Sequence, residues 1–388
     1  MKTKPNTYLI DTTLRDGEQA PGVVFSLNEK LTIAQMLDDI GIEELEVGSP
    51  FISDRDIRTI KKIVSSGFKF RSSCWSRALF DDIEAAAKTG AEGINISYPV
   101  SDIQIEALGK DRNWIFSSLP KIVEFAQNRF KYVSLGAQDA SRADFNLLSQ
   151  YLKMAEELGI HRVRIADTVG ILNPFSTYEL ISKVIAELGS DDMAIEFHGH
   201  NDLGMATANS ISAIHAGANC VSVTVNGLGE RSGNAALEEV VMAMKTSMGT
   251  DNHYDTSLFY ELCRLVESAS GRKLHGSKPI VGEMTHKHES GIHTSSLIRD
   301  ARTYEPYNAK EVGKADSSFV FGKHSGSAAL ISLFKNKGLI ITKEEANDLL
   351  LQVKIYAESQ KRSITSNEIE GLYSRSKIKD TKNRLFAF

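Results

Sequence analysis

The sequence predicts an α/β fold: a (β/α)8 barrel, or TIM barrel, followed by a mostly helical C-terminal extension. Eight short β-rich segments can be counted before residue 230, and segments with the apolar spacing of helices lie between them. The character of the chain changes after Met248. Strands that alternate with helices form parallel sheets. Eight such repeats in about 240 residues are typical of a closed barrel.

The predicted strands are short and are separated by helical segments. A helix is expected over residues 27–40, where apolar residues recur at helical spacing and Gly41 follows as a C-terminal cap. Periodicity does not show whether a sheet closes, so a doubly wound open sheet remains the alternative. The strands are expected to begin near Tyr8, Glu44, Phe68, Gly93, Lys131, Arg162, Ala194 and Cys220.

The chain divides into three segments. Residues 1–250 contain the repeats of the predicted catalytic barrel. Residues 251–326 are expected to be a linking subdomain, much of it rich in glycine and histidine. A long stretch with little regular structure is usually either functional or disordered, and its histidines favour function. Residues 327–388 are expected to form a helical subdomain, because they contain the strongly helical segment Glu344–Ser359.

Composition excludes several classes of protein. The 388 residues carry a net charge of −5, whereas nucleic-acid binding requires a basic surface. No apolar run approaches the length of a membrane span, and Met1–Asn6 lacks the apolar segment of a signal peptide. Cys74, Cys220 and Cys263 are widely spaced, which fits a reducing compartment rather than a disulfide scaffold. We therefore expect a cytoplasmic protein with no nucleic-acid or membrane partner.

The segment AIEFHGHN, residues 194–201, is the first candidate for a functional site. Glu196, His198 and His200 stand two apart, and alternate side chains of a strand point to the same face. An isolated His-x-His pair is more often one core and one surface histidine. Here, however, the pair ends a predicted barrel strand, and barrel active sites are built where the strands end.

Polar residues follow at least four predicted strands at the same end. The first strand runs into residues 11–19, DTTLRDGEQ, and the sixth into Asp167 and Thr168. The seventh ends in the two histidines. One carboxylate and two imidazoles with open positions form a site for a divalent metal that also binds substrate. Polar residues at the same end of four strands therefore favour an enzyme active site over a set of unrelated charged surface turns.

The eighth strand runs into a glycine-rich loop, NGLGERSGN, residues 226–234. Its third glycine falls one position late for a dinucleotide fingerprint. Loops after the last barrel strands commonly hold phosphate, which suits a phosphorylated cosubstrate such as a coenzyme A thioester. The residues expected to bind it are Asn226, Gly227, Gly229, Glu230, Arg231 and Gly233.

Four motifs stand out along the chain: DTTLRDGEQAPG (11–22), EFHGHND (196–202), NGLGERSGNAALEE (226–239) and HESGIH (288–293). They resemble the signatures of the acetyl-CoA-dependent 2-oxo-acid Claisen enzymes, the isopropylmalate, homocitrate and citramalate synthases. The resemblance covers nearly the whole chain. PVSDIQ (99–104) and GAQDASRAD (136–144) are most similar to the nitrogen-fixation-type homocitrate synthases. The resemblance therefore implies that acetyl-CoA is the cosubstrate. The leading function that it implies is the synthesis of homocitrate from 2-oxoglutarate.

The resemblance also implies roles for individual residues. Asp16, His198 and His200 would be the ligands of a divalent metal (Mg, Mn, Co or Zn), with Asn234 close by. Arg15 would stabilise the enolate or the substrate carbonyl.

Other residues would support that centre. Thr168 would hold the 2-oxo-acid carboxylate, while Gln19 and Glu196 would orient the metal ligands. His293 and Tyr304 match residues that reach into a neighbouring subunit's site for proton transfer. The resemblance thus implies a homodimer with shared active sites. Without it, His293 would be read as a capping or core histidine. The implied catalytic residues are Arg15, Glu196, His293 and Tyr304.

Some positions depart from the family pattern. Gln138 stands where the family usually has an active-site glutamate, and an amide supplies no negative charge. Leu79 and Ser134 lie near positions where lysine-pathway homocitrate synthases carry a polar selecting residue and an arginine. Arg77 or Ser97 could then serve the distal carboxylate of 2-oxoglutarate. The expected substrate-binding residues are Arg15, Gln19, Arg77, Leu79, Ser97, Ser134, Gln138 and Thr168.

These departures leave other substrates open. A related synthase could use phosphonopyruvate, as phosphonomethylmalate synthases do, or 2-oxoisovalerate or pyruvate. A metal-dependent aldolase or lyase would share the RDG and HxH motifs but lack the HESGIH-type region. A non-catalytic binding module is least favoured, because the ligand set is complete.

Overall fold

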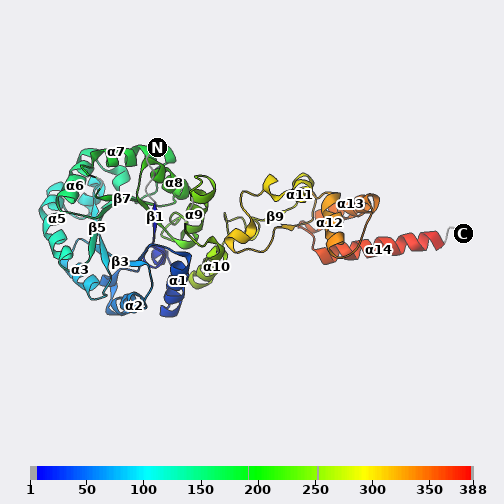
Figure 1. The fold of residues 1–388 in the computed structure, drawn as a ribbon, viewed down its shortest axis with the longest axis horizontal. Coiled ribbons are helices and arrows are strands. Elements are labelled where there is room, and N and C mark those ends of the chain that lie inside the picture. Colours follow the sequence, from blue (N-terminus) through cyan, green and yellow to red (C-terminus); the bar gives the residue numbers. More distant parts are fainter. Residues whose placement is uncertain (1–6, 191, 251–252, 386–388) are drawn as a thin grey trace. The chain divides into compact units, whose positions relative to one another are not determined.

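The computed structural model describes residues 7–190, 192–250 and 253–385. The chain forms two compact units, Met1–Leu274 and His275–Phe388 (Figure 1). The first unit continues past residue 250 because a helix over Phe259–Ser270 packs against the helix over Leu27–Ile40.

The first unit is a closed barrel of eight parallel strands, hydrogen-bonded in sequence order. The first and last strands close it, with Tyr8 paired to Cys220 and Asp11 to Val223. Figure 1 shows the helices outside the ring of strands. The predicted (β/α)8 fold is confirmed, and the open sheet is excluded because no strand edge is left unpaired in a closed barrel. The strands are β1 (Tyr8–Asp11), β2 (Glu44–Glu46), β3 (Arg71–Arg77), β4 (Gly93–Pro99), β5 (Tyr132–Gln138), β6 (Arg162–Asp167), β7 (Ala194–Gly199) and β8 (Cys220–Val223).

The first helix illustrates how local sequence sets the helix boundaries. Ser26 and Glu29 form a capping box at its start, and Gly41 ends it in the left-handed conformation at φ 95°. The expected bounds of 27–40 are confirmed. The helices are α1 (Leu27–Ile40), α2 (Asp54–Val64), α3 (Phe80–Ala87), α4 (Asp102–Ala107), α5 (Arg112–Gln127), α6 (Phe145–Glu157), α7 (Pro174–Glu187), α8 (Ala206–Ala216), α9 (Leu237–Thr246) and α10 (Phe259–Ser270). Short 3-10 helices are η1 (Gly17–Gln19), η2 (Pro50–Ile52), η3 (Ala140–Arg142), η4 (Val225–Gly227) and η5 (Thr256–Leu258).

Charged side chains from three strands pair within the barrel. Arg162 pairs with Glu44 at 2.7 Å and with Glu196 at 2.8 Å. Two residues further along β6, Arg164 pairs with Glu196 at 2.5 Å and with Glu46 at 2.8 Å. All five side chains are buried. Buried charges are tolerated only when they are paired, so this ion chain ties β2, β6 and β7 together.

The second unit is mostly helical, as predicted for the C-terminal region. Its core packs Phe321, Leu330, Phe334, Leu349 and Val353 from two consecutive helices and the segment before them. A two-stranded parallel sheet joins two short strands that precede this core. Its elements are β9 (Lys287–His288), α11 (Gly291–Leu297), η6 (Ala301–Thr303), η7 (Ala309–Val312), β10 (Ser318–Phe319), α12 (Ser327–Asn336), α13 (Lys343–Gln360) and α14 (Ser366–Leu385).

Across the described ranges, none of the helices combines the length and the apolar character that crossing a membrane requires.

Candidate active site

Three predicted metal ligands converge at the ends of two strands. Asp16 follows β1, His198 lies in β7 and His200 follows it. Nε2 of His198 lies 3.3 Å from Nε2 of His200 and 3.4 Å from Oδ2 of Asp16. The ligand atoms of the three residues all lie within 4.8 Å of one another, and all three residues are buried. Strand alternation delivers both imidazoles to one face, as the His-x-His spacing predicts.

Burial and neighbouring charge place these groups in the protonation states that bind metal. Burial lowers the pKa of His198 well below its ordinary value and lowers that of His200, so both imidazoles are neutral. Burial alone would raise the pKa of Asp16, but the adjacent guanidinium of Arg15 outweighs it and holds the pKa below its usual range. Neutral imidazoles and an ionised carboxylate are the forms that coordinate a cation.

The donors fit a divalent cation. Oδ2 of Asp16 is buried and has no hydrogen-bond partner within the described structure. An orphaned buried carboxylate oxygen beside two imidazole nitrogens is explained by a bound cation. Asn234 is adjacent, since its backbone bridges that of His200. Its Nδ2 donates to the Leu228 carbonyl at 3.0 Å, and its buried Oδ1 is likewise without a partner in the described ranges.

Arg15 is held between two carboxylates next to this cluster. Its Nε donates to Glu46 Oε1, and its Nη1 donates to Asp16 Oδ1 at 3.1 Å. Its guanidinium also lies 5.7 Å from the centre of the Trp75 ring. The two carboxylates fix the guanidinium beside the candidate metal ligands, where it can stabilise an oxyanion.

Glu196 belongs to the ion chain and not to the metal cluster. Besides Arg162 and Arg164, its Oε1 accepts a hydrogen bond from the Ser222 hydroxyl. Glu46 connects the same chain to Arg15 and is a residue that the sequence reasoning missed. Burial raises the pKa of Glu46, but Arg15 and Arg164 overcome this and hold it at about 2. A usable signal was its position in a predicted buried strand, between Leu45 and Val47.

A cavity opens beside the metal cluster at the C-terminal ends of the strands. Nine of its lining residues were predicted: Arg15, Asp16, Gln19, Ser97, Gln138, Thr168, His198, His200 and Glu230. The other five were missed: Trp75, Asn95, Gly136, Arg164 and Ala166. Each of these five residues lies two positions along the chain from another lining residue, or on a strand next to one. Because alternate residues of a strand point to the same face, the sequence could have predicted them.

The wall contributed by β4 and β5 is neutral and polar. The Ser97 hydroxyl donates to Oε1 of Gln138 at 3.3 Å, which orients the amide NH2 of Gln138. Asn95 Nδ2 donates to the Ser134 hydroxyl at 2.9 Å, while its Oδ1 is buried without a partner among the described residues. A Cβ on Gly136 would lie 3.2 Å from that Oδ1, so glycine keeps this wall open.

Thr168 follows β6, lines the same cavity and is poised to bind an anion. The Asp139 backbone N–H donates to its Oγ1 at 2.8 Å, which leaves the hydroxyl hydrogen for a substrate carboxylate. Asp139 adopts the left-handed conformation, with φ 62°.

Three expected substrate contacts are placed elsewhere. Arg77 pairs with Asp82 at 2.6 Å and lies over the Phe51 ring. Leu79 is 48% exposed at the start of α3. Ser134 is fully buried behind Asn95. None of the three is among the residues that line the cavity.

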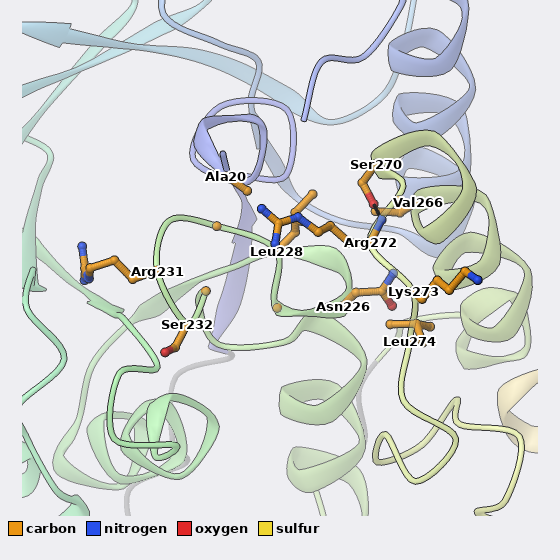
Figure 2. Close-up of a pocket in the computed structure, with 13 residues that line it drawn as sticks. Ala20, Asn226, Leu228, Arg231, Ser232, Val266, Ser270, Arg272, Lys273 and Leu274 are labelled. Carbon is orange, nitrogen blue, oxygen red and sulfur yellow. Dashed lines mark hydrogen bonds between the residues drawn. The ribbon is translucent and has the colours of Figure 1, made fainter. Parts of the chain in front are cut away.

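The glycine-rich loop lines a second cavity (Figure 2). Five of the six predicted cosubstrate residues border it, together with Arg272 and Lys273, whereas Glu230 faces the metal cavity. The fold requires two of the glycines: a Cβ on Gly233 would lie 1.9 Å from the Gly227 carbonyl oxygen, and both have positive φ.

Arg231 ties this loop to the candidate site. Its Nε donates to Asp202 at 2.8 Å, and its Nη2 donates to the Thr168 carbonyl at 2.7 Å. Figure 2 shows its side chain apart from Arg272.

Comparison with known proteins adds the decisive observation. Residues 6–266 match the HMGL-like family, and residues 280–361 match the homocitrate synthase post-HMGL domain-like family. The chain belongs to the HMGL-like family. The resemblance to isopropylmalate, homocitrate and citramalate synthases is thereby confirmed, and the chain is an enzyme.

Similar curated proteins carry three different activities in their names. The chain is 48% identical to 2-isopropylmalate synthase 2 of Caldanaerobacter subterraneus subsp. tengcongensis over 96% of each chain. It is 45% identical to homocitrate synthase 1 of Nostoc sp., over 95% of this chain and 97% of that one. It is 41% identical to a putative (R)-citramalate synthase of Archaeoglobus fulgidus, over 91% of this chain and 72% of that one.

A solved HMGL-like fold agrees with the barrel. Hydroxymethylglutaryl-CoA lyase from Pseudomonas aeruginosa aligns with a TM-score of 0.63 at 18% identity, covering 70% of this chain and 96% of that one. The likeness shows the fold alone.

Two further predicted residues lie in the second unit of this HMGL-like chain. The rings of His293 and Tyr304 stack with centroids 4.0 Å apart, although the two residues lie eleven positions apart in the sequence. Nearby, His288 pairs with Glu305 at 3.0 Å. The two residues that the family resemblance singled out are therefore neighbours in space.

Proposed function

We propose that this enzyme condenses acetyl-CoA with a 2-oxo acid in a metal-dependent Claisen reaction. The preferred 2-oxo acid is 2-oxoglutarate, and the product is homocitrate. The observation that carries the proposal is the convergence of Asp16, His198 and His200 beside Arg15 in a cavity with a neutral polar wall. The named activities of the similar synthases support the reaction class.

Each residue of the candidate site would have a separate role in binding the substrate or stabilising charge. A divalent cation held by Asp16, His198 and His200 would supply Lewis-acid polarisation of the keto group. Thr168 would donate its free hydroxyl hydrogen to the 2-oxo-acid carboxylate. Arg15, fixed by Glu46, would donate to the keto oxygen as it becomes an alkoxide.

The carbon–carbon bond forms between the acetyl methyl carbon and the keto carbon. A base removes one methyl proton, and the enolate adds to the keto carbon, whose oxygen takes up a proton. Water then attacks the thioester carbonyl, so that CoA leaves as a thiol and a carboxylate remains. We propose that His293 and Tyr304 of a neighbouring subunit move the protons, which makes the enzyme a homodimer with shared sites.

The β4–β5 wall favours a substrate with a polar distal group. The amide NH2 of Gln138, oriented by Ser97, would donate to the distal carboxylate of 2-oxoglutarate. The aliphatic end of 2-oxoisovalerate would leave this amide without a partner, and a desolvated polar group without a partner costs about 1–3 kcal/mol. Neutral donors also accommodate the phosphonate of phosphonopyruvate, which remains the second candidate.

Two observations bear on the remaining alternatives. The match of residues 280–361 to a homocitrate synthase domain supports a synthase over a lyase or aldolase on the same barrel. Cys74, Cys220 and Cys263 are all free and buried, which supports the proposed cytoplasmic location.

The test is thiol release from acetyl-CoA by the purified protein, measured with a panel of 2-oxo acids and with each of Mg, Mn, Co and Zn. We expect the highest kcat/KM with 2-oxoglutarate and a product with the mass of homocitrate. A higher kcat/KM with 2-oxoisovalerate or pyruvate would overturn the substrate assignment. If none of the 2-oxo acids in the panel gives a condensation product, even where thiol is released, the reaction class would be overturned.

A further inference from the structure

Two residues hold Thr168 at the end of β6, and both have a backbone conformation that is uncommon outside glycine. The Asp139 N–H donates to Thr168 Oγ1 at 2.8 Å, and Arg231 Nη2 donates to the Thr168 carbonyl at 2.7 Å. Both donors are left-handed, Asp139 at φ 62° and Arg231 at φ 54°. Residues held in this region cluster at functional sites, where the surrounding contacts maintain them. The surroundings of Thr168 therefore fix its orientation.

We infer that Asp139 is a positioning residue, which aims the Thr168 hydroxyl at the carboxylate of the 2-oxo acid. The inference rests on the proposed function for the identity of this ligand. Thr168 lines the metal cavity, whereas Asp139 is not among the lining residues. Asp139 therefore acts on the substrate only through Thr168.

The Asp139 N–H decides where the hydroxyl hydrogen of Thr168 can point. A hydroxyl group has one hydrogen to donate and two lone pairs that accept. The Asp139 N–H occupies one lone pair of Thr168 Oγ1. The hydroxyl hydrogen is left for an acceptor in the cavity, and a carboxylate oxygen is such an acceptor.

The side chain of Asp139 holds the backbone conformation on which this contact depends. Its fully buried carboxylate accepts hydrogen bonds from the Ser101 hydroxyl at 2.5 Å and from Arg142 Nη2 at 2.8 Å. Ser101 caps the start of α4, and Arg142 ends η3. Aspartate and asparagine tolerate the left-handed region better than alanine, because their short polar side chains form local hydrogen bonds. Asp139 is therefore suited to this position by its shape and its contacts.

The negative charge of Asp139 is the rival explanation for a role at this position. The carboxylate pairs with Arg142 at 2.8 Å and lies outside the lining of the cavity. An ion pair formed away from the cavity weakens the field that the carboxylate exerts on a substrate. The backbone contact with Thr168 is therefore the better connection between Asp139 and the site.

The test compares Asp139→Ala with Asp139→Asn. Alanine disfavours the left-handed backbone, so KM for the 2-oxo acid should rise about tenfold, as expected when a hydrogen bond to a charged group is lost. Asparagine tolerates this backbone, so KM should stay within about twofold of the wild type. KM for acetyl-CoA and kcat should be unchanged in both variants.

Asp144→Ala is the matched control. It removes an exposed aspartate that caps the start of α6. Loss of a cap lowers stability, so this variant separates general destabilisation from a defect in substrate binding. Its KM for the 2-oxo acid should match that of the wild type.

A double-mutant cycle tests whether Asp139 acts through Thr168. Thr168→Val removes the hydroxyl, so adding Asp139→Ala in this background should raise KM no further. Ser101→Ala removes one contact that holds Asp139. It should raise KM about threefold in the wild type but not in the Thr168→Val background. This second variant keeps the cycle decisive if Asp139→Ala does not fold.

Each outcome supports or overturns the inference. An unchanged KM in Asp139→Ala, an equal rise in Asp139→Asn, or a further rise in the Thr168→Val background overturns it and leaves the proposed function intact. If the wild type condenses no 2-oxo acid, the proposed function fails. Calorimetric titration with 2-oxoglutarate and Mg²⁺ then replaces KM, with affinity expected to fall about tenfold in Asp139→Ala and to be kept in Asp139→Asn. Absence of binding to the wild type would overturn both.

Discussion

Nε of Arg15 donates a hydrogen bond to the buried carboxylate of Glu46, and this contact sets the guanidinium beside the candidate metal ligands. Glu46 also accepts from Arg164, which pairs with Glu196. The arginine of the candidate site is therefore the end of an ion chain that crosses the barrel. Glu46 acts as a positioning residue, because it reaches the site only through Arg15.

Removing the carboxylate of Glu46 should lower the catalytic rate without affecting metal binding. In Glu46→Gln we expect kcat to fall about 100-fold, since small displacements of a catalytic group cost rates of this order. Metal content should be unchanged. Loss of one buried charge should lower the free energy of unfolding by about 3 kcal/mol. Steady-state kinetics, metal analysis and urea denaturation would check these expectations, and an unchanged kcat would remove Glu46 from the positioning role.

Each metal ligand should be necessary for metal binding. The variants Asp16→Ala, His198→Ala and His200→Ala should keep the far-ultraviolet circular dichroism of the wild type. Their affinity for a divalent cation should fall at least about 100-fold, because loss of a direct ligand exceeds the effect of losing its supporting partner. Calorimetric metal titration measures this. His215→Ala, at an exposed position on α8, is the control, and full metal content in Asp16→Ala would refute the ligand set.

The proposed sharing of sites between subunits can be tested by complementation. His293→Ala and His198→Ala should each be inactive. Mixed heterodimers should regain activity, because one of their two sites would then contain both residues. A mixture of Asp16→Ala with His198→Ala has both defects in the barrel and should stay inactive. Absence of recovery after confirmed subunit exchange would contradict shared sites.

Gln138 should determine charge selectivity. In Gln138→Glu, a second carboxylate would face the distal group of a doubly charged substrate. Like charges about 4 Å apart repel by roughly 4 kcal/mol at an effective dielectric constant near 20. We expect kcat/KM for 2-oxoglutarate to fall at least about tenfold, while kcat/KM for pyruvate is spared or improved. An equal change for 2-oxoglutarate, phosphonopyruvate and pyruvate would show that Gln138 does not select substrates.

Stability should depend on pH through Asp11, which is fully buried in β1. Burial raises the pKa of Asp11 to about 7, although hydrogen bonds from Thr13 act in the opposite direction. The unfolded carboxyl titrates near pH 4. Between about pH 4 and pH 7 the folded protein therefore holds a proton that the unfolded chain has released. The contribution of Asp11 to stability is full below this window and is lost as pH rises through it.

Replacement by a neutral residue isolates this effect. Relative to the wild type, Asp11→Asn should gain up to about 4 kcal/mol in the free energy of unfolding between pH 4 and pH 7.5. Urea denaturation across this range measures the difference. Asp81→Asn, at an exposed position on α3, is the matched control, and parallel curves for Asp11→Asn and the wild type would count against a protonated Asp11.

The sequence by itself determined the features that depend on local rules. The bounds of α1 follow from the Ser26 cap, its apolar stripe and Gly41. The pair His198 and His200 follows from the strand period of two, which holds wherever the strand is placed. The order of strands and helices likewise pointed to a barrel before any contact between them was known.

Only the tertiary structure decided the features that depend on partners distant in the chain. The barrel is closed by the pairing of Tyr8 with Cys220, which no periodicity encodes. Glu196 shares a strand face with the metal ligands, yet Arg162 and Arg164 draw it into the ion chain. Arg77 was expected at the substrate, but Asp82 holds it elsewhere. The reason is physical: spacing fixes the direction of a side chain, whereas its role depends on the charges and hydrogen-bonding groups that the fold brings to it.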